Sequence, residues 1–252
     1  MLYFTADTHF GHENVLKLDG RPFATVEEMD EALIANWNAV VRPCDTVWHL
    51  GDFLWRTDIE YAAGIIERLN GEIRLLKGNH DNVLAKLLEK GRLPVRARAK
   101  IAYVGDYREV RSERKRFVMS HYPMPCYNGR FHTKKGENEG IYMLHGHVHA
   151  TFEQTIMQAL AYGQNPPMQL VNVGCMLWGY APVSIAQIEA ACKRPCGNRA
   201  DSECRNRWWR GCPECEGCAF GSYWHGDRSF GHLANPDLFK PMHLGRWQCS
   251  GD

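Results

Sequence analysis

The chain has 252 residues, of which 44% are hydrophobic, and this is long enough for one substantial core with a small appendage. The formal net charge of +1 at pH 7 excludes a strongly basic nucleic-acid-binding protein on bulk charge alone. The sequence opens without a basic segment and a long apolar run, and it has no stretch of about eighteen apolar residues. We therefore expect a cytoplasmic protein without a signal peptide or a membrane span.

The first half of the sequence alternates predicted strands with predicted helices. The strands are short apolar runs, at residues 2–6, 46–50 and 73–76. The helices have apolar residues at helical spacing, at residues 26–40 and 59–69. Thr25 followed by Glu28 has the form of a capping box, which predicts a helix start. This order of elements is typical of an α/β protein.

The second half has apolar runs with few helical signals between them. These runs lie at residues 117–119, 141–144, 170–173 and 183–185. They predict a second sheet packed on the first. Residues 154–162 predict a short helix, and the glycine and prolines of residues 163–167 predict a loop after it.

A basic stretch spans residues 92–116. Its cations are Arg92, Arg96, Arg98, Lys100, Arg108, Arg111, Arg114, Lys115 and Arg116. We interpret them as a solvated basic face, although such a cluster could also attract a phosphate-bearing substrate over some distance.

Polar side chains follow the predicted strands in five short segments. These are Asp7-Thr8-His9, Gly51-Asp52, Gly78-Asn79-His80-Asp81, Ser120-His121 and His145-Gly146-His147-Val148-His149. Strand ends of such sheets are where ligands bind, so we expect the polar groups to converge. Oxygen and imidazole donors without cysteine suit Mn²⁺, Fe²⁺, Zn²⁺ or Ni²⁺. Scattered loop and core residues are the alternative interpretation, and the three closely spaced histidines argue most strongly against it.

These residue types suit phosphate ester hydrolysis with two metal ions. Two ions about 3.5 to 4 Å apart can share one carboxylate and one hydroxide, and Asp52 is the natural bridging carboxylate. Such a pair makes hydroxide available near neutral pH and neutralises charge on the phosphoryl oxygens. His80 is the candidate that protonates the leaving oxygen, since an imidazole exchanges protons near neutral pH.

Taken in order, the five segments resemble the calcineurin-like metallophosphoesterase superfamily over residues 1–190. Residues 7–14, Arg21-Pro22-Phe23 and residues 49–52 look like a small bacterial and phage branch of it. The resemblance implies an α/β fold, a four-layer αββα sandwich with the metals at one edge of the paired sheets.

The resemblance also implies roles for individual residues. One ion would be held by Asp7, His9, Asp52 and His149. The other would be held by Asp52, Asn79, His121 and His147. His80 would contact the phosphate and assist the leaving group, with Asp81 orienting that imidazole.

The expected function is therefore a dinuclear metal-dependent hydrolase of a phosphodiester or phosphomonoester, acting through a metal-bridging hydroxide, and a nucleotide is one candidate substrate. One alternative is a nuclease whose tail grips DNA or RNA. Another is a zinc-bearing binding module with an inactive phosphoesterase domain.

Several other polar or aromatic residues lie near the motifs. His12 and Arg21 are predicted to bind substrate, with a contact behind a metal ligand or a salt bridge as the structural alternatives. His49 and His145 are interpreted as core histidines. Three tryptophans are interpreted as packing residues, although one could stack on a base: Trp48, Trp55 and Trp178.

We divide the chain into a metallophosphoesterase domain, residues 1–190, and a Cys-rich tail, residues 191–252. Of the ten cysteines, all but Cys44, Cys126 and Cys175 follow residue 190. The tail spacing suits a tetrahedral structural zinc, with these predicted ligands: Cys204, Cys212, Cys215 and Cys218. Cys192 or Cys196 could replace the first, and disulfides or a disordered tail are the alternatives.

Overall fold

The structure of the protein is a computed structural model, and it describes residues 1–56, 58–130, 140–162 and 168–193. The described residues up to Cys192 belong to one compact unit. The predicted loop at residues 163–167 and the predicted zinc ligands of the tail lie outside the described residues. Among the described helices, none is long and apolar enough to cross a membrane.

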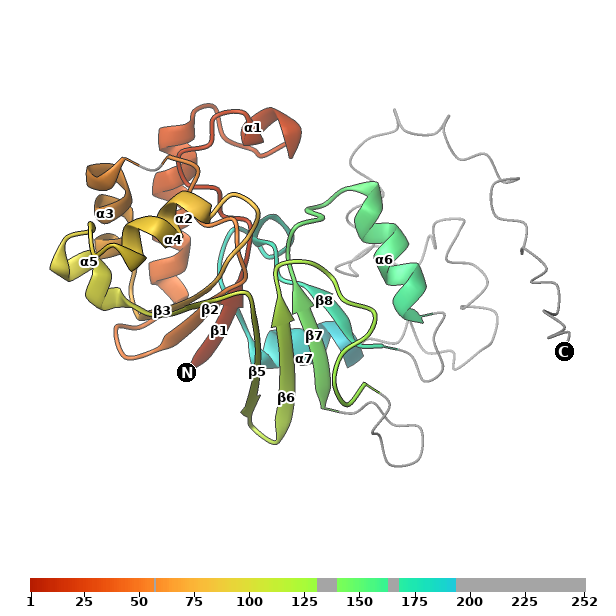
Figure 1. Cartoon of the computed structure of the whole chain (residues 1–252). Coiled ribbons are helices and arrows are strands. Elements are labelled where there is room, and N and C mark those ends of the chain that lie inside the picture. Colours follow the sequence, from red (N-terminus) through yellow and green to blue (C-terminus); the bar gives the residue numbers. More distant parts are fainter. Residues whose placement is uncertain (57, 131–139, 163–167, 194–252) are drawn as a thin grey trace, which may run out of the picture. The chain divides into compact units, whose positions relative to one another are not determined.

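The first sheet has the strand order β4-β3-β2-β1-β9 (Figure 1). Its strands are β1 (Leu2–Thr5), β2 (Thr46–His49), β3 (Glu72–Leu76), β4 (Ile101–Gly105) and β9 (Val183–Ser184). The first four run parallel, and β9 is antiparallel to β1. Thr5 pairs with His49, and His49 pairs with Leu75, so the carboxyl ends of β1, β2 and β3 meet at one edge.

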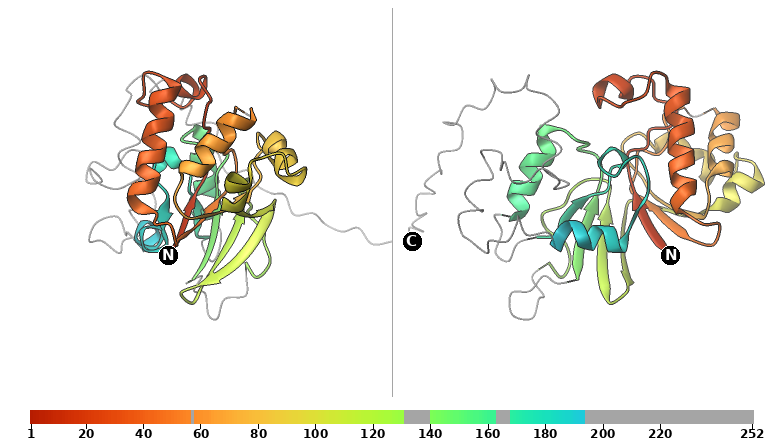
Figure 2. Two further views of the ribbon diagram at one scale, coloured as in Figure 1. Left: turned by 90° about the vertical axis from the view of Figure 1, so that its left-hand side faces the viewer. Right: turned by 180° about the vertical axis from the view of Figure 1, so that it is seen from behind.

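Helices cover one face of this sheet (Figures 1 and 2). They are α2 (Val26–Val40), α3 (Ile59–Arg68), α4 (Asn82–Glu89) and α5 (Val95–Lys100), with the short α1 (Val15–Leu18) before them. The predicted capping box begins α2, because the backbone N–H of Glu28 donates to Thr25 Oγ1 at 3.2 Å. The buried face of α2 carries Met29, Leu33 and Trp37, which join one core with alternate strand residues such as Val47.

The second sheet has the order β5-β6-β7-β8. Its strands are β5 (Tyr107–Ser112), β6 (Lys115–Ser120), β7 (Ile141–His145) and β8 (Leu170–Asn172). The other alternate residues of the first sheet, such as Phe4 and Trp48, pack with Phe117 and Leu144 of the second in a separate core. Helix α6 (Phe152–Tyr162) lies against β8. The predicted αββα arrangement is thereby confirmed.

Two parts of the prediction need correction. Residues 183–185 were expected in the second sheet, but β9 pairs with β1 in the first, and α7 (Ile185–Lys193) begins directly after it. The basic stretch contains α5, β4 and β5, which the sequence analysis did not predict. Its cations do lie mainly at the surface, as expected: Arg92, Arg96, Arg98, Arg108, Arg111 and Arg114 are exposed.

Candidate metal centre

The candidate ligands lie on loops that follow five parallel strands of the two sheets. Asp7 and His9 follow β1, Asp52 follows β2, and Asn79 follows β3. The remaining three, His121, His147 and His149, follow β6 and β7. Backbone hydrogen bonds join neighbouring loops within each sheet: Asp7 N–H donates to Gly51 O at 2.9 Å, and Gly146 N–H donates to His121 O at 3.0 Å.

The first group of ligands consists of Asp7, His9, Asp52 and His149. Each offers a donor atom within 4.8 Å of the others. His9 Nε2 lies 3.3 Å from His149 Nε2 and 3.6 Å from Asp52 Oδ2. This is the set that the resemblance implied for one ion.

The second group consists of Asp52, His121 and His147, again within 4.8 Å of one another. The side-chain oxygen of Asn79 lies 3.0 Å from both His121 Nε2 and His147 Nδ1, so Asn79 joins this group. His121 Nε2 is 3.5 Å from Asp52 Oδ2. Asp52 thus belongs to both groups, as a bridging carboxylate must.

Three of the imidazoles are held so that Nε2 faces the ligand group. His121 Nδ1 donates to Leu50 O at 2.8 Å, and His149 Nδ1 lies 3.2 Å from Asp19 Oδ1. His9 Nδ1 lies 3.4 Å from His12 Nδ1. A ring whose Nδ1–H is engaged offers the Nε2 lone pair, which is the form that binds a metal ion.

The backbone of these loops is strained where the ligands sit. Five ligands adopt left-handed backbone conformations that non-glycine residues rarely take: Asp7, His9, Asp52, His147 and His149, with φ between 46° and 70°. Such conformations cost about 1–3 kcal/mol each and persist at functional sites because the surroundings impose them. Gly51 allows the close approach of the loops, since a Cβ there would lie 2.5 Å from His121 Nδ1.

Burial opposes charge on the donors of the site. It raises the pKa of Asp7 to about 7 and also raises the pKa of Asp52. It lowers the pKa of His9 well below its ordinary value and that of His121 to about 4. Two buried carboxylates beside imidazoles and an amide oxygen are a donor set that suits divalent cations. The residues present therefore fit two metal ions.

Asp19 is a part of the site that the sequence analysis missed. Its carboxylate lies between His149 Nδ1 and Arg21 Nε, at 3.2 and 2.9 Å. Burial opposes the charged form of His149, but the hydrogen bond with Asp19 and the Asp7 carboxylate nearby raise its pKa. The only sequence signal for this role of Asp19 was its position two residues before the Arg-Pro-Phe segment.

Arg21 was predicted to bind substrate, but its side chain is fully buried. Its guanidinium donates to the carbonyl oxygens of Asp7 and Thr8 at 2.7 and 2.9 Å and pairs with Asp19. Arg21 therefore holds the first ligand loop in place.

His12, also predicted to bind substrate, lies behind the ligands. It is buried beside His9 and stacks on Trp55 with ring centroids 3.8 Å apart and planes 4° apart. These contacts favour the alternative for His12, a contact behind a metal ligand.

His80 and Asp81 differ in position. The His80 side chain is partly exposed, with Nε2 3.9 Å from Asp52 Oδ2, and its backbone N–H donates to Asp52 Oδ1 at 2.9 Å. Asp81 is buried and accepts the backbone N–H groups of Asp52, Phe53 and Gly78 at 2.7 to 2.9 Å. The predicted orientation of His80 by Asp81 is therefore replaced by a different role: this carboxylate joins the loops after β2 and β3.

The two remaining histidines of the motifs lie in the core, as predicted. His49 Nε2 is 2.9 Å from Thr8 Oγ1, and burial lowers its pKa to about 3. His145 Nδ1 donates to Gly146 O at 2.9 Å, and burial lowers its pKa to about 4.

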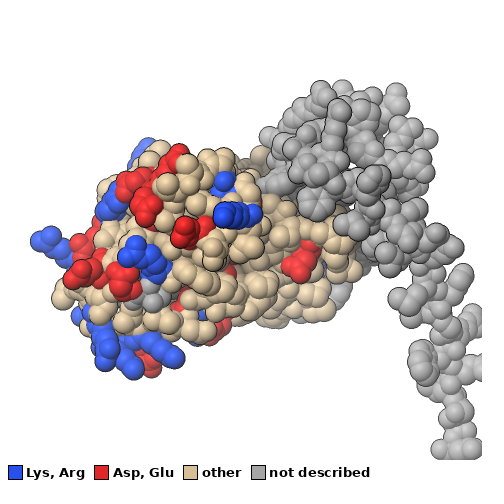
Figure 3. All heavy atoms as spheres, turned by 90° about the horizontal axis from the view of Figure 1, so that it is seen from above, with Lys and Arg blue, Asp and Glu red and all other residues tan. Residues whose placement is uncertain are grey.

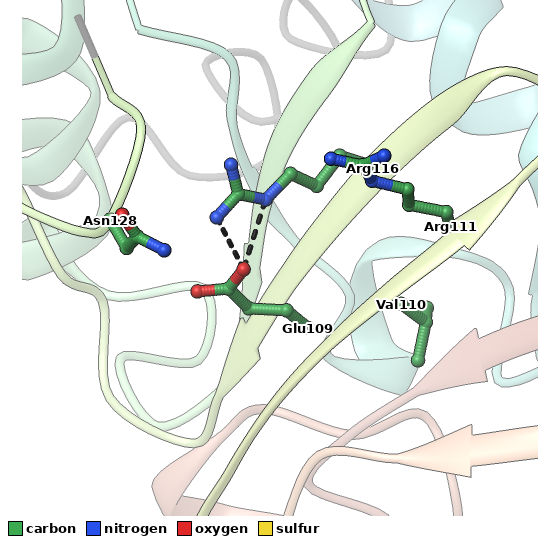
Figure 4. A pocket seen from close by; sticks show the side chains of 5 residues that line it. All are labelled: Glu109, Val110, Arg111, Arg116 and Asn128. Atoms are coloured by element: carbon green, nitrogen blue, oxygen red, sulfur yellow. Dashed lines mark hydrogen bonds and ion pairs between the residues drawn. The ribbon is translucent and has the colours of Figure 1, made fainter. Parts of the chain in front are cut away.

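A pocket of about 380 Å³ lies elsewhere, over β5 and β6, and none of the candidate ligands lines it (Figure 4). Arg116 in this pocket is paired with Glu109. Seen from above, the described part of the surface has cationic and anionic side chains interspersed (Figure 3). Neither feature points to a second charged binding site.

Comparisons with known proteins identify the family of the chain. Residues 2–188 match the calcineurin-like phosphoesterase superfamily domain. An uncharacterized protein of Methanocaldococcus jannaschii is 36% identical over 185 residues, which cover 73% of this chain and 86% of the relative. The Gene 66 protein of Mycobacterium phage L5 is 28% identical over 201 residues, covering 70% of this chain and 87% of the phage protein.

Among solved structures, a protein of unknown function from Aquifex aeolicus is similar, with a TM-score of 0.56 and 26% identity. The alignment covers 75% of this chain and 98% of that one. The chain belongs to the calcineurin-like phosphoesterase superfamily, and its Asp and His residues form a possible metal-binding site.

Proposed function

We propose that the protein hydrolyses phosphate esters with two divalent metal ions, Mn²⁺, Fe²⁺, Ni²⁺ or Zn²⁺, and that phosphodiesters are its preferred class. The observation that carries this proposal is the pair of ligand groups that share Asp52. Seven ligands are too many for one ion, and their oxygen and imidazole donors suit these metals.

When bound, two such ions activate water and neutralise charge on the phosphoryl oxygens. The chain itself supplies orientation and a proton. Asp52 fixes the backbone of His80 through the 2.9 Å hydrogen bond, which leaves the partly exposed ring at the edge of the ligand groups. From there His80 contacts the phosphate and donates a proton to the leaving oxygen.

Two alternatives lead to different measurements. A nuclease would cleave single-stranded nucleic acid faster than small diesters, and its tail would be required. An inactive domain would bind metal without hydrolysing any ester. The complete set of ligands favours an active enzyme over the second alternative.

Elemental analysis and an ester screen test the proposal. After reconstitution with Mn²⁺, the full chain is expected to hold two equivalents of metal in addition to any zinc, and Asp52→Asn is expected to lose metal from both groups. Nitrophenyl monoesters and diesters should be hydrolysed. A single tightly bound ion that Asp52→Asn leaves in place would contradict the shared carboxylate.

His80→Ala provides the matched test of the proton donor. This variant should retain both ions but lose turnover by about 10² to 10⁴ on esters with a poor leaving group. The loss of turnover should be smaller for esters whose leaving group is nitrophenolate, because this group hardly needs protonation. Equal losses for good and poor leaving groups would rule out the general-acid role.

A further inference from the structure

Two exposed aromatic side chains lie beside the candidate metal centre, Trp55 next to His80 and Tyr122 next to the candidate ligand His147. Trp55 is 44% exposed and Tyr122 is 48% exposed. The Trp55 ring lies 4.8 Å from the His80 ring, and the Tyr122 ring lies 4.5 Å from the ring of His147. Large apolar side chains exposed at a catalytic centre are typical of ligand contacts.

Trp55 differs from the other tryptophans in the described part of the chain. Trp37 and Trp48 are buried in the two cores, and Trp178 is half-buried with its Nε1–H donating to Asn172 O at 2.9 Å. Trp55 instead remains at the surface, where the packing of the core does not require an aromatic side chain.

The Trp55 ring is also held rigidly. Its backbone N–H donates to Phe10 O at 2.9 Å, next to the bridge that pairs Phe10 with Leu54. The ring stacks on His12, which in turn touches the ligand His9. A flat ring that is fixed in advance loses little conformational entropy when it binds another flat ring.

A planar aromatic ring close to a phosphate is a property of nucleotides. Sugar phosphates and phospholipid headgroups lack such a ring, whereas every nucleobase has a face that can stack on an aromatic side chain. We propose that the substrate is a nucleotidyl phosphodiester whose base stacks on Trp55, with Tyr122 beside the substituent on the other side of the phosphate. This inference rests on the proposed phosphoesterase function and names its substrate class.

Two diesters with the same leaving group test the proposal on the Mn²⁺-loaded full chain. They are the p-nitrophenyl esters of thymidine 5′-phosphate and of ethyl phosphate. The nucleotidyl ester should be preferred, and Trp55→Ala should lower its kcat/KM by about 5-fold to 150-fold, the range measured for one stacked base. The ethyl ester should be nearly unaffected.

Control variants separate stacking from folding. Trp55→Phe keeps an aromatic face and should retain most of the preference for the nucleotidyl ester. Leu160→Ala shortens an apolar side chain that is 53% exposed on α6, and it should change neither rate. An equal loss on both esters in Trp55→Ala would overturn the proposal, because the ring would then act only by packing on His12.

Calorimetric titration distinguishes failure of the base-stacking proposal from failure of the proposed phosphoesterase function. If neither ester is hydrolysed, thymidine 5′-phosphate and ethyl phosphate are compared as ligands of the Mn²⁺-loaded protein. Tighter binding of the nucleotide that disappears in Trp55→Ala would support stacking while the phosphoesterase function fails. Equal binding of the two ligands would overturn the base-stacking site.

Discussion

At the scale of single residues, a carboxylate that is not a ligand controls one of the ligands. Asp19 accepts from His149 Nδ1 and so leaves Nε2 of this histidine directed at Asp7 and His9. The same carboxylate is joined to Arg21, which holds the Asp7 loop from behind. The first ligand group is therefore positioned by a buried ion pair between Asp19 and Arg21.

Replacing Asp19 should weaken metal binding more than it weakens the fold. In Asp19→Ala we expect the metal affinity to fall by about 10-fold to 100-fold, as is usual when the partner of a ligand histidine is removed. Asp19→Asn should lie between this variant and the natural protein, because an amide oxygen can still accept from Nδ1. Titration of the metal-free protein with Mn²⁺ measures this effect directly.

Glu31→Gln is the control for the Asp19 variants, since Glu31 forms an ion pair with Arg68 at the surface, in contact with none of the ligands. It should leave the metal affinity unchanged. If Asp19→Ala binds Mn²⁺ as tightly as the natural protein and only melts at a lower temperature, Asp19 merely holds the loop.

The residues of the candidate metal site could be located from the sequence because their types and spacing are local properties of the sequence. Histidines at positions 147 and 149 and the Asn-His-Asp segment limit the possible chemistry to a few metals and reactions. The roles of Arg21, Asp19 and Asp81 could not be predicted, because a buried charge and an exposed charge look the same in a sequence. Their roles follow from contacts between loops that are far apart along the chain.

At the scale of elements, the turns after the strands require small residues. Gly78 follows β3 closely, and a Cβ at this position would lie 2.1 Å from Asp52 Oδ1 and 2.4 Å from Asp52 N. Both atoms belong to the shared ligand. The turn can therefore tolerate no side chain without moving Asp52.

Replacing glycine by alanine should have different effects on metal binding and stability at two positions, Gly78 and Gly64. Gly78→Ala should lose metal from both groups and lose hydrolysis, because Asp52 must shift. Gly64→Ala lies within α3, where nothing is within 4 Å of the added Cβ, and should stabilise the protein by about 0.5–1 kcal/mol without changing activity. Thermal unfolding and metal content measure the two effects, and a Gly78→Ala variant with full metal content would contradict the crowding argument.

Elements with strong local signals could be located from the sequence. Helix α2 begins and ends where it was predicted, because its capping box and its apolar spacing lie within one segment. Strand β5 was missed because half of its residues are charged, namely Arg108, Glu109 and Arg111, and it lies at the edge of its sheet. Its pairing with β6, rather than its own apolar content, makes it a strand.

At the scale of the whole molecule, the two-sheet architecture was predicted, but the partner of one strand was not. The apolar run at residues 183–185 has no feature that distinguishes the two sheets. It joins β1 because η2 (Cys175–Leu177) and the turn after it lead the chain back to the first sheet, where Cys175 N–H donates to Ala6 O at 2.9 Å. Long-range pairing of this kind leaves no local pattern in a sequence.

The Cys-rich tail is proposed to be a separate zinc-stabilised part that does not contribute to catalysis. Its thiolates are soft ligands at spacings suited to a closed tetrahedral site, whereas the donors of the candidate metal centre are oxygen and imidazole and all come before residue 150. Replacing Cys212 and Cys215 together by serine in the full chain should therefore release zinc and make the tail sensitive to protease. Hydrolysis of ethyl p-nitrophenyl phosphate should survive, and Cys126→Ser, which replaces an exposed cysteine outside the tail, should leave both zinc and activity unchanged. If the double variant keeps both catalytic metals and a normal melting temperature but loses this hydrolysis, the tail contributes to the active site and the boundary near residue 190 is wrong.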